Sequence, residues 1–147
     1  MPSIADLLAQ GRLERVEPQE EEAGDLIRHA NAHLDSARTV VDADAAGAYQ
    51  LAYDAARKAV VAHMVANGYR AKSDRPGAHA ALVAYAEEAL DEVADAASLA
   101  QLDRMRRLRN RSEYGGISLG RSQVEADIEH AAEIVRSVAG ESGRSLG

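Results

Sequence analysis

The chain has 147 residues, enough for one domain with a proper core, and it contains no cysteine, which excludes disulfides and thiolate-bound metals. The first 15 residues lack the pattern of a secretory signal, and no apolar run approaches the ~20 residues that span a bilayer, so we expect a soluble cytoplasmic protein without membrane contact. The net charge of −7 argues against a protein that coats nucleic acid over its whole surface. Without Phe or Trp, the core must consist of Ala, Leu and Val, which favours closely packed helices.

The N-terminal half predicts a short lead and two long helices. Residues 1–19 are expected to form the lead, with a helical piece from Ile4 to Ala9 and a connector that holds Gly11 and Pro18. From residue 20 to 41, apolar side chains recur at helical spacing, at Ile27, Leu34, Ala37 and Val41. The next helix, 44–67, stops at Gly68 and is apolar nearly all round, which is typical of a central helix.

The C-terminal half predicts three more helices. After a break at 73–77, the third helix carries Leu82, Ala86, Leu90 and Val93. Two capping boxes, Ser98 with Gln101 and Ser122 with Glu125, are expected to start the fourth and fifth helices. The pattern shows no strand, and residues 141–147 are expected to form a frayed tail. We therefore predict an all-α protein in which residues 20–140 form an up-and-down antiparallel bundle of about five principal helices.

Arginines gather in one stretch of this acidic chain, "RMRRLRNRSEYGG" at 104–116. Residues 101–114 hold five arginines against Asp103 and Glu113, a local charge of +3 that leaves −10 for the remainder. On a helical wheel, Leu102, Met105 and Leu108 form the buried stripe of the fourth helix. Arg104, Arg107 and Arg111 point away from that stripe, as solvated surface residues do, whereas Arg106, Asn110 and Tyr114 form one polar ridge at i, i+4 and i+8.

Arg109 falls within about 40° of the centre of the buried stripe. A guanidinium so close to a core needs an anion, because an unpaired buried charge is very costly. Glu113, four residues on, could supply that anion as an internal ion pair. Alternatively, the planar fork of Arg109 could bind a phosphate from outside the chain.

Several stretches together resemble HEPN domains, the all-helical domains of prokaryotic toxin–antitoxin and defence systems. Arg109 and Asn110, followed by three residues and a ring, resemble the signature R-N-x-x-x-H of that family. The segments "AYQLAYDAARKAVVAHMVANGYR" at 48–70, "PGAHAAL" at 76–82, "LDRMRRLRNRSEYGG" at 102–116 and "GRLERVEP" at 11–18 are similar to an actinobacterial branch of it. The resemblance covers nearly the whole chain.

The resemblance implies a homodimer in which the two signature helices face one another, and in active members a metal-independent ribonuclease without cofactors. Arg109 would stabilise the scissile phosphate, and Asn110 would have a polar, orienting role. The proton-carrying histidine is replaced by Tyr114, which departs from the signature. A tyrosine with a pKa near 10 is ionised to about one part in a thousand at pH 7, and losing acid–base catalysis typically costs ~10² to 10⁴ in rate. The resemblance therefore supports a HEPN fold for this chain more strongly than it supports ribonuclease activity.

Two function classes stay open at this point. The first is a dimeric RNA- or nucleotide-binding protein of the toxin–antitoxin or defence type, with a degenerate endoribonuclease site and with Arg106, Arg107 and Arg111 as further phosphate ligands. The second is a non-enzymatic interaction module or antitoxin, whose arginines pair with acidic residues of a partner or of the twin subunit. A minimal nucleotidyltransferase is a candidate partner, because such enzymes modify a tyrosine of HEPN toxins. That tyrosine usually lies two residues beyond the histidine, where this chain has Gly116, so Tyr114 matches it only loosely.

Other polar residues have weaker signals. His79 could approach the signature helix and supply the missing imidazole. Lys58 could reach the polar groove of the dimer, although its ammonium group could equally extend to solvent. His63 is expected to be a packed, hydrogen-bonded residue of the central helix. Asp25, His29 and His33 share one helix face but lack a further strong ligand, so we expect no metal site.

Overall fold

The computed structural model describes residues 3–72, 78–94, 96–114 and 120–145, and for 109–114 and 142–145 it describes the backbone alone. The described part of the chain forms six helices and one two-stranded sheet, which confirms the predicted all-α bundle. In chain order the elements are α1 (Ile4–Ala9), β1 (Leu13–Arg15), α2 (Glu20–Val40), α3 (Ala45–Ala66), β2 (Tyr69–Ala71), α4 (Ala78–Ala89), α5 (Ala96–Tyr114) and α6 (Arg121–Ser145). The six-residue α1 and the five longer helices match the predicted lead and principal helices.

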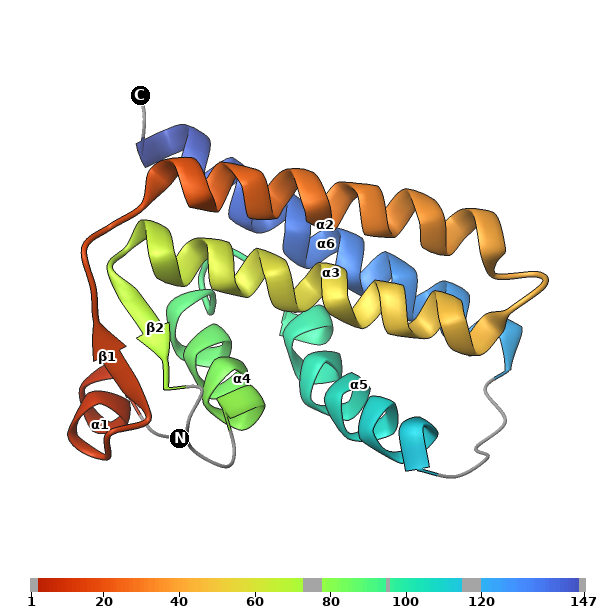
Figure 1. The fold of residues 1–147 in the computed structure, drawn as a ribbon, viewed down its shortest axis with the longest axis horizontal. Helices are drawn as coiled ribbons and strands as arrows, with labels where there is room; N and C mark the ends of the chain where they lie inside the picture. The colour runs from red at the N-terminus through yellow and green to blue at the C-terminus, as the bar shows by residue number, and fades with distance from the viewer. Residues whose placement is uncertain (1–2, 73–77, 95, 115–119, 146–147) are drawn as a thin grey trace.

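The long helices α2, α3 and α6 pack together, and the shorter α4 and α5 lie on the other side of α3 (Figure 1). Helix α6 begins beside the turn between α2 and α3, where Arg121 Nη2 lies 2.8 Å from Asp42 Oδ1. It therefore runs in the same direction as α3 and opposite to α2 (Figure 1). Strict alternation of five helices would have made α6 run with α2. The pair α4 and α5 instead crosses the face of α3 and returns the chain to the end where α3 began.

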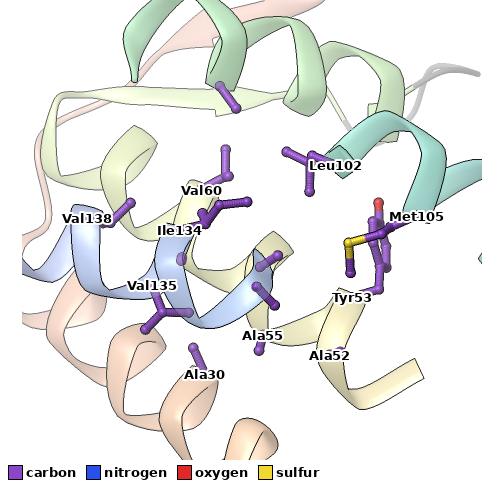
Figure 2. Packing of buried hydrophobic residues seen from close by; sticks show 14 of the residues in the cluster. Ala30, Ala52, Tyr53, Ala55, Val60, Leu102, Met105, Ile134, Val135 and Val138 are labelled. Carbon is purple, nitrogen blue, oxygen red and sulfur yellow. The ribbon is translucent and has the colours of Figure 1, made fainter. Parts of the chain in front are cut away.

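Helix α3 is central because small side chains let its neighbours approach closely. Eleven of its residues are buried: Ala48, Tyr49, Ala52, Tyr53, Ala55, Ala56, Ala59, Val60, Ala62, Met64 and Val65. Figure 2 shows Ile134 and Val135 of α6 and Ala30 of α2 in the same apolar cluster as Ala55 and Val60 of α3. The prediction that this helix is apolar nearly all round is confirmed.

The starts of α5 and α6 were predicted less well than those of α1, α2 and α3. Helix α1 has a capping box between Ser3 and Asp6, and Asp44 caps α3 by accepting from Gly47 N at 2.8 Å. The two predicted capping boxes are wrong. Helix α5 begins at Ala96, so Ser98 lies inside its first turn, 1% exposed, with its hydroxyl 3.2 Å from His130 Nδ1. Helix α6 begins at Arg121, one residue before Ser122.

Two short strands also contradict the sequence pattern, which showed none. Strands β1 and β2 pair antiparallel, with Leu13 opposite Ala71 and Arg15 opposite Tyr69. Gly68, the residue before β2, has a φ of +83°, and an added Cβ would lie 2.9 Å from Val16 O, so a glycine is required at this close approach. Three residues per strand are too few to give a visible alternation of apolar and polar side chains.

The ends of the chain extend the bundle. The lead packs onto it, since Leu7 is fully buried and α1 contacts α4. The helical backbone of α6 continues to Ser145, beyond the expected end near Gly140. No helix in the described ranges is long and apolar enough to cross a bilayer.

Candidate nucleic-acid interface

Helix α5 carries the arginine-rich stretch, and its apolar stripe fixes which way the arginines face. Leu102 and Met105 are fully buried and Leu108 is partly buried, which confirms the predicted stripe. Figure 2 shows Leu102 and Met105 pointing from α5 toward the side chains of α3. Because burial of this stripe sets the rotation of α5 about its axis, the polar positions between the stripe residues turn toward solvent or toward α6.

A buried hydroxyl adds a polar contact between α3 and α5. Tyr49, which is fully buried, donates its hydroxyl to the backbone oxygen of Met105 at 3.1 Å. Burial raises the pKa of Tyr49, and the negative charge of Asp127 raises it further. The hydroxyl therefore stays protonated and can donate. This contact holds the backbone of α5 one turn before Arg109.

Arg104 connects α5 to α6. Its guanidinium donates to Oδ1 of Asp127 and to Oε1 of Gln101. Asp127 is fully buried and also accepts from Gln123 Nε2 at 3.3 Å, and its Oδ2 has no hydrogen-bond partner among the described residues. The expectation that Arg104 is a solvated surface residue is therefore wrong: its side chain is 33% exposed and is tied to a buried carboxylate.

Asp103 holds the next two arginines. Its Oδ1 accepts from Arg106 Nε at 3.0 Å and Nη2 at 2.8 Å, and its Oδ2 lies 2.7 Å from Arg107 Nη2. Partial burial acts to raise the pKa of Asp103, but the hydrogen bonds and charges of the two arginines outweigh it, so the pKa is lowered overall. The carboxylate is therefore ionised at neutral pH with both oxygens engaged.

The remaining signature residues occupy the last turns of α5. Arg109, Asn110, Arg111 and Tyr114 have helical backbone, and α5 ends at Tyr114. Their side chains, and that of Glu113, lie outside the described residues. The choice between an internal pair of Arg109 with Glu113 and a phosphate ligand thus stays a prediction.

His79, the second residue of α4, is bonded to α3. Its Nδ1 lies 3.0 Å from the hydroxyl of Tyr53, and the two rings stack with centroids 6.1 Å apart. Tyr53 is fully buried and lies one turn from Tyr49, the residue that contacts α5. The imidazole is thereby oriented at the side of α3 on which α5 packs.

The comparison with protein families decides what this arrangement is. The model of the HEPN domain matches residues 23–141, which span α2 to most of α6 and include the arginine-rich helix. The chain belongs to the HEPN family. A comparison with curated proteins gives no match. HEPN membership fits a module that acts on RNA or nucleotides, and HEPN domains commonly dimerise.

Lys58 of this HEPN domain contacts α2. Its ammonium group is 2.5 Å from His33 Nε2, and Lys58 lies five residues after Tyr53 on α3, so the two side chains face different directions. The reach of Lys58 toward the polar groove of a dimer stays a prediction. Burial lowers the pKa of His33, and the charge of Lys58 lowers it further. Asp25 pairs with Arg28, and no three metal-ligating side chains cluster within the described part of the HEPN chain.

His63 forms the hydrogen bond that was predicted for it. Its Nδ1 lies 2.8 Å from the hydroxyl of Tyr85, and burial lowers its pKa. It is only partly buried, however, because it lines a cavity of about 350 Å³ between the start of α2 and the ends of α3 and α6, together with Ile27, Ala66 and Asn67. No pattern in the sequence predicted this cavity.

Two carboxylates that matter for the arginine helix of the HEPN domain were missed by sequence reasoning. Asp103 could have been found, since it lies three and four residues before Arg106 and Arg107. Asp127 could not, because it is 23 residues from Arg104 and reads as an ordinary polar position of α6.

Proposed function

We propose that this HEPN chain is a homodimeric RNA- or nucleotide-binding protein of the toxin–antitoxin or defence type, acting in the cytoplasm. The observation that carries the proposal is the arginine content of α5. Arg106 and Arg107 lie three and two residues before the signature position Arg109, and the side chain of Arg107 is 65% exposed. Guanidinium groups match the oxygens of a phosphate backbone.

The proposed roles follow the HEPN signature. Arg109 stabilises a phosphate, Asn110 orients it, and Arg106, Arg107 and Arg111 add phosphate contacts. Any cleavage proceeds without a metal, with the ribose 2′-hydroxyl as nucleophile and Tyr114 as a weak proton carrier. His79 is an auxiliary candidate for proton transfer, supported by its hydrogen bond to Tyr53 next to the α5 face of α3.

Binding is tested with Arg109→Ala and a single-stranded RNA oligomer, measured by fluorescence anisotropy over a range of salt concentrations. We expect the affinity to fall and the slope of log affinity against log salt to become smaller, because one phosphate contact is lost. Arg121→Ala is the control, since Arg121 lies on α6, is 63% exposed and pairs with Asp42 and Glu125. An affinity that Arg109→Ala leaves unchanged would refute the proposal.

Catalysis is tested by RNA cleavage in the presence of a chelator. We expect little cleavage by the natural chain, and Tyr114→His is expected to increase the rate by ~10² to 10⁴, because a histidine can give and accept protons at neutral pH. The double variant Arg109→Ala, Tyr114→His should lose that gain. A chelator-sensitive reaction, or a gain that survives the loss of Arg109, would contradict the assigned roles.

The second candidate function is an interaction module without enzymatic activity. It is favoured by the pairing of the described α5 arginines with carboxylates: Arg104 with Asp127, and Arg106 and Arg107 with Asp103. The candidate partner is a minimal nucleotidyltransferase, and its action would appear as a nucleotide adduct on the peptide that holds Tyr114, detected by mass spectrometry after co-expression. RNA binding that is absent in the natural chain, together with a salt-sensitive protein complex lost in Arg106→Ala, would select this function.

A further inference from the structure

Asp103 forms ion pairs with Arg106 and Arg107, the two arginines of α5 directly before the signature residues. Both of its oxygens are used: Oδ1 by two nitrogens of Arg106, at 3.0 and 2.8 Å, and Oδ2 by Arg107 at 2.7 Å. A carboxylate with one guanidinium on each oxygen presents the same acceptor geometry as two oxygens of a phosphate group. The helix thus supplies its own anion to the groups that would bind a ligand.

The three side chains of this cluster remain reachable from solvent. Their side-chain exposures are 28% for Asp103, 21% for Arg106 and 65% for Arg107. Exposed ion pairs three and four residues apart on a helix are weak, each typically contributing a few tenths of a kcal/mol. An incoming anion can therefore displace this carboxylate, unlike the fully buried carboxylate of Asp127, which holds Arg104.

We propose that the carboxylate of Asp103 competes with phosphate for Arg106 and Arg107. A chain of linked phosphates, such as an RNA backbone, displaces this carboxylate from the two arginines, but an isolated phosphate ion does not. This inference rests on the proposed function of α5 as a phosphate-binding helix. It assigns Asp103 a specificity-determining role, although the residue does not itself contact the ligand.

The selectivity follows from effective concentration. A carboxylate tethered one turn away competes as if it were present at millimolar concentration or higher, so a single phosphate at lower concentration cannot displace it. An RNA strand that already contacts one α5 arginine presents its neighbouring phosphates at a similarly high effective concentration. Each contact that the strand makes helps the next one to displace the carboxylate.

The experiment compares Asp103→Asn with the matched control Asp54→Asn. Asp54 also pairs with an arginine three residues on, Arg57 at 3.7 Å, but it lies on α3, and both changes remove one negative charge. The probes are a ten-nucleotide single-stranded RNA, measured by fluorescence anisotropy, and inorganic phosphate as its competitor. We expect Asp103→Asn to bind the RNA about three- to fivefold more tightly than Asp54→Asn does, a gain of the size of two exposed ion pairs. Inorganic phosphate should compete more strongly against Asp103→Asn than against the natural chain.

The outcomes separate this inference from the function on which it rests. If RNA binding is weakened by Arg106→Ala and Arg107→Ala but is the same in Asp103→Asn and Asp54→Asn, the role of Asp103 is refuted and the binding function stands. If neither the natural chain nor Asp103→Asn binds RNA, both fail. RNA binding that appears only in Asp103→Asn would support the competition by Asp103 but would contradict RNA binding as the function of the natural chain. Asp103→Ala, confirmed as folded by circular dichroism, repeats the test with a side chain that cannot accept a hydrogen bond.

Discussion

Helices α3 and α5 lie against each other but are held in place by different forces. Helix α3 buries eleven residues, and polar groups in and beside its core meet uncharged partners, such as Tyr49 with the oxygen of Met105 and the partly buried His63 with Tyr85. In helix α5, the polar side chains next to the apolar stripe are arginines paired with Asp103 and Asp127. We expect the position of α3 to respond to changes in side-chain volume, and that of α5 to changes in charge.

This difference also separates two kinds of arginine on one helix. Arg104 meets a carboxylate that is fully buried, so exchanging this partner for a ligand would leave a charge inside the protein. Arg106 and Arg107 meet a carboxylate that stays in contact with water. The first pair therefore stabilises the fold, and the second pairs can exchange partners.

The largest effect is expected from Arg104→Ala. The substitution leaves the buried charge of Asp127 without its cationic partner, which typically costs about 3–5 kcal/mol of unfolding free energy. The double variant Arg104→Ala, Asp127→Asn removes that charge and should recover most of the loss. Urea unfolding followed by circular dichroism measures both. A double variant as unstable as the single one would show that the cost comes from lost packing of Arg104.

The next effect tests the volume limit at α3. Ala59 is fully buried, and Ala59→Leu should destabilise the protein by about 1–3 kcal/mol, because the added methylenes force the neighbouring helices apart. The control Ala100→Leu makes the same substitution at an exposed position of α5 and should change the free energy of unfolding by less than about 0.5 kcal/mol. Equal effects at the two positions would remove the proposed difference between the helices.

The sequence predicted those parts of the fold that depend on local pattern. The helix at Ile4–Ala9 was predicted to the residue, and α2 and α3 begin and end within one residue of expectation, because their apolar stripes and flanking glycine are visible in the chain itself. The stripe of Leu102 and Met105 followed from the same periodicity. Each of these features needs information from only a few neighbouring turns.

What was missed depends on residues far apart in the chain. The strands exist because residues 13–15 meet residues 69–71, and Ser98 is buried because His130 lies opposite it. The helical wheel predicted that Arg104 faces solvent, but its side chain reaches Asp127 on α6. The sequence pattern did not predict the direction in which α6 runs. The signature residues of the candidate site were found from the family resemblance, and the roles of their side chains remain predictions.

Tyr49→Phe tests the contact that joins the two helices. It removes the hydroxyl that donates to Met105 O, so we expect a loss of about 0.5–1.5 kcal/mol, the usual net contribution of one hydrogen bond. Amide hydrogen exchange should show faster exchange in α5 than in α3. Tyr69→Phe, at a partly exposed ring, is the control and should change exchange in neither helix. Faster exchange spread evenly over α3 and α5 would mean that the contact supports the whole bundle and does not specifically hold α5.

The smallest effect concerns pH and the far end of α3. Burial lowers the pKa of His63 from its ordinary value of 6.5, so the folded protein binds the proton less tightly than the unfolded chain does. Stability contributed by the neutral imidazole should be fully present above about pH 6.5 and should be lost as the pH falls toward the folded pKa. In His63→Gln the midpoint of urea unfolding should change less between pH 7.5 and 5 than it does in the natural chain. His29→Gln, at an exposed position of α2, should leave this pH dependence of the midpoint unchanged. If His63→Gln and the natural chain lost stability in parallel as the pH falls, the acid sensitivity would come from another group. The contact of His63 with Tyr85 would then make no contribution to the pH dependence of stability.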